Sequence, residues 1–440
     1  MKDNLHHELI QALKKAQDDS VLGYRLEDWR VTVSRAQIIT LGIKNNAGGS
    51  VYTPPAFKNS EHADVYLVWQ DGKCSKAKVQ KPFAGAKYDW NRELKFWRMA
   101  AFEDPYSKTI PYPAKLPEVR IASDEIKTMI ESGNRFIFDQ QGKILSNRPQ
   151  GAQTGANIMA LWGRNSVFTS TGINVTYNES RYAVSWSFDS QIARGYAKRR
   201  MITESEWQEL WDESISRYEV IKNQAEPVHK KTVVILAPSV VEQMAEQYIL
   251  SNFNGENIVQ GQSKFTQEDF IQNKKVFHEG ISMEIDPLRP YQWTSYLLTS
   301  EGIPALYTAL VLNGVLCSPI LNAKYGLRWG ILPTAIPYGA AGIRMRQNNQ
   351  IPWTDMLKGI DDGILVLSVL GLHTQNPVSG SFSLAVPSGL RIKNGHFVGK
   401  ADIRINGSYW DILNSPDTAC GISELDNCPY LLTPCLCENL

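Results

Sequence analysis

The sequence predicts an α+β fold: an N-terminal α/β domain with a mixed sheet and helices, followed by a β-rich C-terminal domain. Three observations indicate this division. The 440 residues are too many for one ordinary core, and 43% of them are hydrophobic, enough to build more than one. Residues 173–188 alternate polar and apolar side chains with the period of a strand. After residue 250, short apolar runs are interrupted by Gly, Pro and Asn, which is typical of short strands.

In the first half, helical and strand-like segments follow one another. The tryptophan-rich segment 88–102 has an aromatic apolar face, which predicts a helix packed against a core. Four prolines between residues 105 and 117 predict an extended traverse. The expected helices span 4–17, 88–102, 123–132 and 204–219; the expected strands span 28–41, 64–70 and 73–79; a Gly- and Asn-rich break falls at 45–50; and a β region follows the third helix up to about residue 190.

A β-hairpin is expected where Asp71-Gly72 separates the strands 64–70 and 73–79. Asp and Gly both tolerate positive φ angles, so this dipeptide favours a two-residue type I′ turn.

The domain organisation follows from a polar break at 224–231. We expect an N-terminal domain over 1–225 and a C-terminal domain over 226–440. A strand at 232–236 and a helix at 239–250 open the second domain.

Charge and hydropathy exclude two classes of protein. With 46 basic and 45 acidic side chains, the chain lacks the basic excess of a nucleic-acid-binding protein. Its longest apolar stretch, 364–372, is far shorter than a membrane-spanning helix. The first 17 residues have no apolar core of signal-peptide length. We therefore expect a cytoplasmic protein with no nucleic-acid partner and no membrane contact.

Four of the six cysteines lie near the C-terminus: Cys420, Cys428, Cys435 and Cys437. Structural zinc usually requires two pairs of closely spaced ligands, whereas the separations here are eight, seven and two residues. Cys435 and Cys437 would face the same way on a strand, so metal binding stays an alternative. Reduced thiols are the favoured interpretation.

Motifs of catalysis are mostly missing. The sequence has no phosphate-binding loop, no nucleophile elbow, and no pair of histidines spaced to bind zinc from one helix. One unusual segment, 371–384, follows a buried-strand pattern and gathers small polar side chains between glycines. Such a turn either lines a cleft or only closes on itself. The candidate cleft residues are His373, Thr374, Asn376, Ser379 and Ser383.

This segment and several others, in the same order, resemble the TldD/PmbA family, also called the modulators of DNA gyrase. The resemblance extends from about residue 175 to the end of the chain. Its blocks are Val233 to Pro238 (VVILAP), Asn254-Gly255-Glu256, Gly261-Gln262-Ser263, Ser300-Glu301-Gly302-Ile303-Pro304, Asn313-Gly314-Val315-Leu316, the segment 371–384, Gly389 to Gly395, Ile403 to Leu413 and Cys420-Gly421.

The resemblance implies a zinc site in one branch of the family. TldD-type members carry an HExxxH helix shortly after the VVILAP-like strand, with two histidines and a C-terminal cysteine as zinc ligands and the glutamate as general base. The equivalent stretch here, Glu246 to Ser251, contains no histidine, and Cys420 aligns with the third ligand without partners. The chain is therefore similar to the metal-free TldE (PmbA) members. Two further departures are Ser300 and Ser381, where aspartate is usual.

The resemblance further implies a closed dimer that encloses a chamber. On this interpretation the chain is the metal-free subunit of a two-subunit zinc peptidase that processes unfolded or short peptides. A TldD-like partner supplies zinc and the general base, and this chain binds no cofactor. A homodimer is possible without that partner. We expect the aromatic-rich segments 88–102 and 177–188 to offer apolar surface for the contact.

Two alternatives remain open. In the first, the chain is a metal-independent enzyme, with His373 as acid or base and Ser379, Ser381 or Ser383 as its hydroxyl partner. In the second, the chain is a binding or regulatory protein without chemistry.

Overall fold

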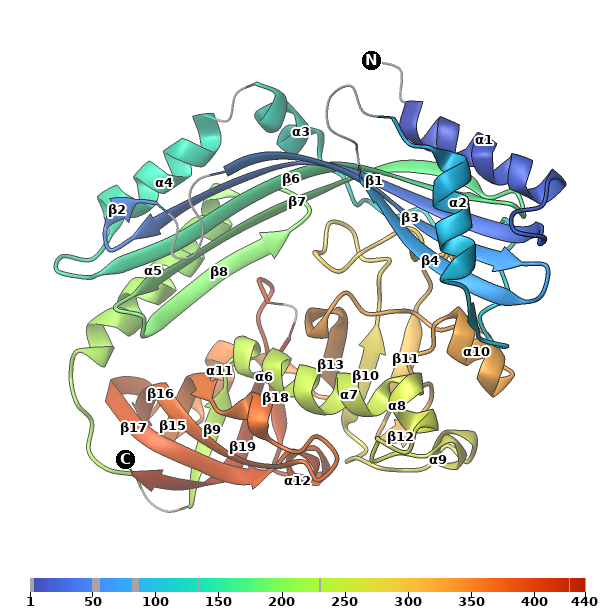
Figure 1. Ribbon diagram of the computed structural model, residues 1–440. Helices are drawn as coiled ribbons and strands as arrows, with labels where there is room; N and C mark the ends of the chain where they lie inside the picture. The colour runs from blue at the N-terminus through green and yellow to red at the C-terminus, as the bar shows by residue number, and fades with distance from the viewer. Residues whose placement is uncertain are drawn as a thin grey trace.

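A computed structural model describes residues 4–49, 56–80, 87–132, 135–228, 231–426 and 428–439. Within them the chain forms two layers: an arched sheet from the first half lies over a smaller sheet and a β-barrel from the second half (Figure 1). No helix in these ranges is long and apolar enough to cross a membrane. The domain boundary stays a prediction, and residues 229 and 230 of the polar break, like Ser50 of the earlier break, lie outside the described residues.

The large sheet has the strand order β5-β4-β3-β1-β6-β7-β8, and β2 pairs with β1. All of its described strand pairs are antiparallel, so the expectation of a mixed sheet is wrong. Short turns join β3 to β4, β6 to β7 and β7 to β8, whereas parallel neighbours would require crossover connections. The strands are β1 (Leu26–Lys44), β2 (Ala47–Gly48), β3 (Ala56–Trp69), β4 (Lys73–Gln80), β5 (Phe102–Glu103), β6 (Thr154–Thr169), β7 (Asn174–Phe188) and β8 (Ile192–Lys198).

Five helices accompany the large sheet, and one of them was not expected. Helix α4 occupies residues assigned to the β region, so that expectation is wrong for 135–147. Ile137, Gln140 and Ile144 are buried at helical spacing, and the two isoleucines join the core beneath α3 and α5. The helices are α1 (Asn4–Asp18), α2 (Trp90–Met99), α3 (Asp124–Glu131), α4 (Arg135–Asn147) and α5 (Glu204–Ile221).

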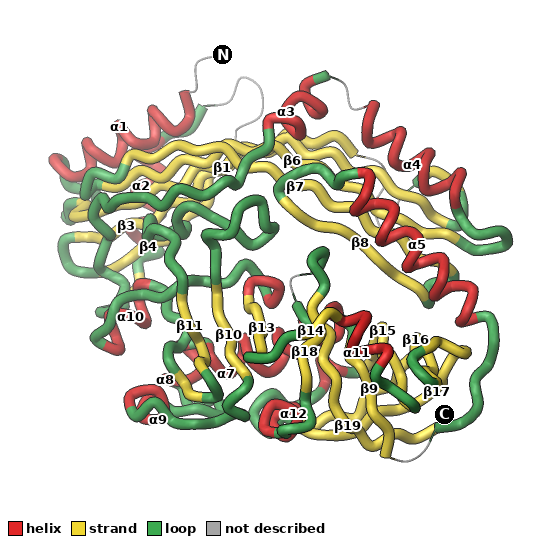
Figure 2. The backbone as a smooth tube through the Cα atoms, turned by 180° about the vertical axis from the view of Figure 1, so that it is seen from behind, coloured by secondary structure: helices red, strands yellow, loops and turns green. Residues whose placement is uncertain are grey.

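Period-two alternation gives the large sheet one apolar and one polar face. On β1, Trp29 and Val31 are buried against α1 and α2. Arg30 and Thr32, between and beside them, point to the opposite face. Seen from the front and from behind, that polar face lies over the second half of the chain (Figures 1 and 2).

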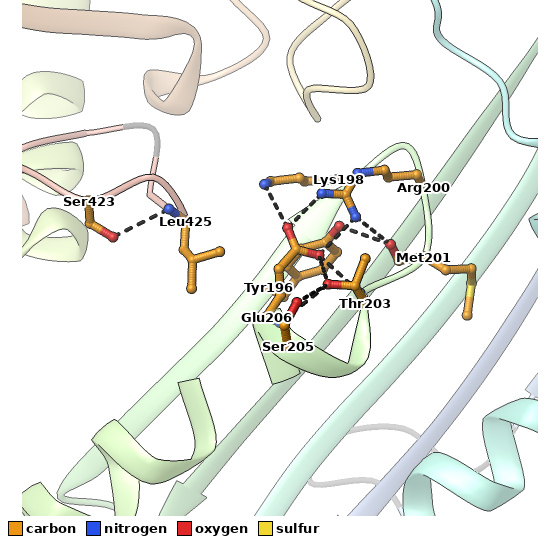
Figure 3. Close-up of polar contacts among 9 residues, drawn as sticks. All are labelled: Tyr196, Lys198, Arg200, Met201, Thr203, Ser205, Glu206, Ser423 and Leu425. Carbon is orange, nitrogen blue, oxygen red and sulfur yellow. Dashed lines mark hydrogen bonds and ion pairs between the residues drawn. The ribbon is translucent and has the colours of Figure 1, made fainter. Parts of the chain in front are cut away.

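The start of α5 is stabilised by a cluster of ion pairs around Glu206 and by a helix N-cap (Figure 3). The Glu206 carboxylate accepts hydrogen bonds from Arg200 at 2.6 and 2.8 Å, from Lys198 at 3.3 Å and from the N–H of Thr203 at 3.0 Å. Burial alone would raise the pKa of Glu206, but these donors lower it to about 2. Thr203 and Glu206 also form a capping box, which satisfies N–H groups at the helix start.

The second half contains a closed barrel of five strands, β9-β15-β16-β17-β19, because β9 pairs with both β15 and β19. Closure leaves these five strands without a free edge. This confirms the β-rich C-terminal part. The strands of the seven-stranded sheet are β9 (Lys231–Leu236), β14 (Ile351–Pro352), β15 (Asp362–Leu370), β16 (Ser381–Lys393), β17 (His396–Ser408), β18 (Ala419–Ile422) and β19 (Tyr430–Asn439).

A four-stranded antiparallel sheet stands beside the barrel, in the order β12-β11-β10-β13. Its strands are β10 (Ile281–Ile285), β11 (Thr308–Leu312), β12 (Val315–Leu316) and β13 (Ile343–Gln347). The short helices of the second half are α8 (Gly255–Val259), α9 (Gln267–Ile271), α10 (Ala323–Trp329), η2 (Ala340–Gly342), α11 (Trp353–Lys358), η3 (Leu372–Thr374) and α12 (Tyr409–Asn414).

One longer helical segment links these parts, and we call it helix 238–253. It consists of α6 (Pro238–Met244), the π-helical turn η1 (Ala245–Leu250) and α7 (Ser251–Phe253). Val240, Val241, Met244 and Tyr248 bury its apolar side in the core shared with the barrel. Its start matches the expected helix at 239–250.

The hairpin at Asp71-Gly72 is confirmed, but its turn is not type I′. Gly72 has a φ of 78°, whereas Asp71 is not among the residues with positive φ. The N–H of Gly72 donates to the carbonyl of Trp69 at 2.7 Å, so the connection has three residues. A type I′ pattern occurs one hairpin earlier instead, where Asn45 and Asn46 have φ angles of 51° and 65°.

Three of the four aromatic side chains in 177–188 do not offer the apolar surface that was expected for a dimer contact. Tyr182, Trp186 and Phe188 are buried, and Trp186 packs against Trp207 and Trp211 of α5. In α2, by contrast, the side chains of Phe96 and Met99 are exposed. The dimer and its chamber stay predictions.

Candidate functional site in the space between the two layers

Two cavities lie between the polar face of the large sheet and the second half of the chain. The first, about 680 Å³, we call the arginine cavity. The second, about 570 Å³, we call the serine cavity. The arginine cavity is lined in part by Arg30, Tyr177, Glu179, Arg181, Arg199 and Glu301. The serine cavity is lined in part by Ser185, Ser187, Ser239, Glu242, Asp426 and Tyr430.

Helix 238–253 reaches both cavities. Ser239 and Glu242, in its first turns, line the serine cavity. Leu250, near its end, lines the arginine cavity. Glu246 lies between them in sequence, is exposed, and interacts electrostatically with Glu242. The helix is therefore a common wall of the two cavities.

The π-helical turn η1 coincides with the stretch that the resemblance aligns with the zinc helix. In a regular α-helix, side chains five positions apart diverge by about 140°, given 3.6 residues per turn. A π turn instead pairs residue i with residue i+5. Here the Ser251 hydroxyl donates to the carbonyl oxygen of Glu246 at 3.4 Å. The backbone thus brings the two aligned ligand positions toward one face, although Glu246 and Ser251 occupy them.

The residues present do not fit a zinc ion at this place. Serine is a poor zinc ligand, and Cys420, the aligned third ligand, is buried at 0% exposure. Burial raises the pKa of the Cys420 thiol to about 12, which opposes the thiolate that zinc requires. Among the described residues, no group of three or more His, Cys, Asp or Glu side chains could hold a metal ion.

The predicted cleft segment 371–384 forms η3, a turn, and the start of β16. Asn376 accepts hydrogen bonds from the N–H groups of Val378 and Ser379 at 2.8 and 3.1 Å. The Ser379 hydroxyl donates to the carbonyl of Asn376 at 3.3 Å. Thr374 donates to the carbonyl of Gly371 at 2.8 Å. These bonds hold the turn in shape.

All five predicted cleft residues are exposed: His373, Thr374, Asn376, Ser379 and Ser383. The lining of the two cavities does not include them. Ser383 instead accepts a hydrogen bond from Arg404 at 3.4 Å. Their role in binding stays a prediction.

The structure does bring this segment against helix 238–253, which the sequence did not indicate. Gln247 donates to the carbonyl of Gln375 at 2.6 Å, and Asn252 donates to the carbonyl of Pro377 at 2.9 Å. The Tyr248 hydroxyl donates to the carbonyl of Ser381 at 3.3 Å. The aligned zinc-helix stretch and the family-like turn are therefore one structural unit.

Glu179 organises the arginine cavity. Its carboxylate pairs with Arg199 at 2.8 Å and Arg181 at 3.6 Å, and it accepts from Asn165 at 2.8 Å. Burial would raise the pKa of Glu179, but the two arginines hold it below its usual value. Burial and Glu179 raise the pKa of Tyr177 to about 12. Sequence reasoning missed this cluster, although the period-two pattern of 173–188 places residues 177, 179 and 181 on one face.

Arg30 forms no salt bridge within the described part of the chain, and Glu301 is its nearest acidic neighbour by electrostatic effect. One of its guanidinium nitrogens reaches the carbonyl of Glu301 at 3.5 Å, and the group lies 5.0 Å from the Tyr66 ring centroid. Burial lowers the pKa of Arg30. The negative charge of Glu301 opposes this effect, so Arg30 and Glu301 are opposite charges in the wall of the arginine cavity.

The fold is thus an arched antiparallel sheet over a small barrel, with a π-turn helix between two cavities. Residues 229–432 match the family model described as the PmbA/TldA metallopeptidase C-terminal domain. These residues therefore form the C-terminal domain of the TldD/PmbA family.

Solved structures share this fold along the whole chain. TldE from Thermococcus kodakarensis superposes with a TM-score of 0.74 at 17% identity, covering 98% of this chain and 99% of that one. A candidate modulator of DNA gyrase from Bacteroides thetaiotaomicron gives 0.76 at 14% identity, covering 98% and 99%. An uncharacterised protein of Methanocaldococcus jannaschii is 22% identical over 247 residues, so the match spans about half of each chain (53% and 56%).

Proposed function

We propose that this chain is the metal-free, TldE-like subunit of a two-subunit zinc peptidase that acts on unfolded or short peptides. A TldD-like partner supplies zinc and the general base. The observation that carries this proposal is helix 238–253. It has a π turn at the aligned position, but Glu246, Gln247 and Ser251 stand where the resemblance expects histidine, glutamate and histidine.

In this assembly, zinc in the partner would polarise the peptide carbonyl and lower the pKa of the attacking water. The part of this chain would be to bind peptide. Together, its two cavities are large enough to hold several side chains of a peptide. Both cavities lie along helix 238–253. Their walls mix charged groups and hydroxyls, which suit the many polar groups of an extended backbone.

The experiment is co-purification from the native host with a tag on this chain. We expect the captured partner to carry an HExxxH segment and one zinc ion per heterodimer. Each subunit alone should leave an unfolded model peptide intact, and the mixture should cleave it. Cleavage by this chain alone, resistant to chelators, would support the metal-independent alternative instead. Cleavage that depends on His373 would identify its site.

Size-exclusion chromatography with light scattering tests the assembly itself. A stable interface buries on the order of 2,000 Å² or more. A monomer across micromolar concentrations, with no partner captured from lysate, contradicts the proposal.

A further inference from the structure

The two arginines of the serine cavity are each matched by a carboxylate. Arg194 of β8 binds both oxygens of Asp426, at 2.5 and 2.9 Å, and also contacts Glu213 at 3.0 Å. Arg217 of α5 pairs with the other oxygen of Glu213 and donates to the Tyr430 hydroxyl at 3.2 Å. These bidentate and bridged pairs leave neither guanidinium free to neutralise a further anion.

Glu242 also lines the serine cavity, but it pairs with neither of these arginines. Within the described part of the chain, it has neither an ion pair nor a hydrogen bond from its side chain. Its charged neighbours are Glu246 on the same helix and Asp426 on the loop opposite, both acidic. Burial, with these two acids, raises the pKa of Glu242. When it is ionised, Glu242 therefore adds one negative charge that neither arginine of the cavity pairs with.

The remaining polar wall combines the amides of Asn157, Gln191 and Gln243 with small hydroxyl groups. Ser185 and Ser187 come from β7, Ser239 precedes Glu242 by one turn, and Ser368 comes from β15. Serine hydroxyls accept as well as donate hydrogen bonds. The start of helix 238–253 offers few N–H donors, because Pro238 has none and those of Val240 and Val241 bond to the carbonyl of Ala237. An anionic ligand would meet the negative charge of Glu242 while the charges of both arginines are already matched by carboxylates.

We propose that the serine cavity binds a primary ammonium group, with Glu242 as its counter-ion and serine hydroxyls as further acceptors. An ammonium group has three donors and one positive charge, which matches one carboxylate flanked by hydroxyls. This inference rests on the proposed function, in which the ammonium belongs to a peptide, at its N-terminus or on a lysine side chain.

The sign of the pH dependence follows from the charges around Glu242. An ammonium group binds the ionised carboxylate, so affinity rises as pH rises through the pKa of Glu242. Both peptide amines stay protonated below about pH 7. The other groups facing the cavity are Arg194, Arg217, Asp426, Cys428 and Tyr430; Arg194 pairs with Asp426, and Arg217 pairs with Glu213.

The test is calorimetric titration of the full chain, without its partner, with three probes. The first is trialanine amide with a free N-terminus, the second is its N-acetylated form, and the third is N-acetyl-lysine amide. We expect the acetylated trialanine amide to bind at least tenfold more weakly than the free form, about 1.4 kcal/mol. Preference for the first or the third probe identifies the source as the peptide N-terminus or the lysine side chain.

Glu242→Gln should abolish the preference for an amine, whereas Glu209→Gln, an exposed acid on α5, should leave it unchanged. If Glu242→Gln does not fold, the pH series of the wild-type chain decides, with Glu242→Asp as the second variant. Equal binding of free and acetylated peptide, no binding of any amine, or affinity that does not rise with pH overturns the proposal. Because the partner is absent, these outcomes are independent of whether the two-subunit peptidase forms.

Discussion

Gln247 donates its side-chain amide to the carbonyl oxygen of Gln375 at 2.6 Å, joining helix 238–253 to the turn that precedes β16. Gln247 occupies the position that the resemblance assigns to the general base of zinc-bearing members. In this chain the Gln247 side chain has a structural role, because its amide N–H donates to a backbone carbonyl.

We expect Gln247→Ala to lower the free energy of unfolding by about 1 kcal/mol, the usual contribution of one intramolecular hydrogen bond. Thermal unfolding followed by circular dichroism measures the change. Gln243→Ala, at an exposed position of the same helix, is the matched control and should have little effect. Equal stability of the two variants would contradict this structural role of Gln247.

The turn at Asn376 and Ser379 tests the predicted cleft. Asn376→Ala with Ser379→Ala removes acceptors of backbone N–H groups, so some loss of stability is expected. If the turn also meets peptide, cleavage by the heterodimer should fall when it is normalised to folded protein. Normal cleavage per folded molecule, with a lower melting temperature, would assign the turn a structural role only.

The ion pair between Arg194 and Asp426 joins the two layers, and both side chains are largely buried, at 13% and 11% exposure. Asp426→Asn leaves a buried guanidinium with one remaining carboxylate, Glu213. We expect a loss of about 3 kcal/mol in unfolding free energy, measured by urea titration with tryptophan fluorescence. Asp355→Asn breaks an exposed pair with Lys358 and should change stability by less than about 0.5 kcal/mol. A similar small change for Asp426→Asn would show that the layers do not depend on this pair.

Glu206 should contribute to acid sensitivity. Its folded pKa of about 2 lies below the unfolded value, so its contribution is complete above the unfolded pKa and is lost as pH falls toward 2. Glu206→Gln should therefore lower the melting temperature at pH 7 and reduce its decrease between about pH 5 and pH 3. Glu204→Gln, which removes an exposed acid of the same turn, is the control. Parallel pH curves for wild type and Glu206→Gln would contradict the assignment.

The π turn predicts how zinc binding can be changed. The isolated wild-type chain should retain little zinc after dialysis, as measured by plasma mass spectrometry. Glu246→His with Ser251→His places two imidazoles toward one face and should raise the zinc content above that of either single variant. No increase would show that the turn does not align these positions. Stoichiometric zinc in the wild-type chain would instead point to the C-terminal cysteines.

The sequence predicted elements well where local pattern and burial agree. The alternation in 173–188 became β7, and the VVILAP segment became β9 and the start of helix 238–253. The prediction was wrong at α4. Ile137 and Ile144 have helical spacing there, but the strand-like sequence around them favoured a β region. It also failed at Asp71-Gly72, because the dipeptide favours a turn without fixing how many residues the loop contains.

The sequence by itself determined the alternation of strands, the family resemblance, and the missing histidines at 246 and 251, since these depend on residue identity and local spacing. Only the tertiary structure decided which charges meet. Arg194 and Asp426 are 232 positions apart, and Arg30 and Glu301 are 271 apart. Their proximity arises from stacking the two layers, and so does the isolation of Glu242. No short-range pattern encodes it, because the free energy of a buried charge depends on every element that packs around it.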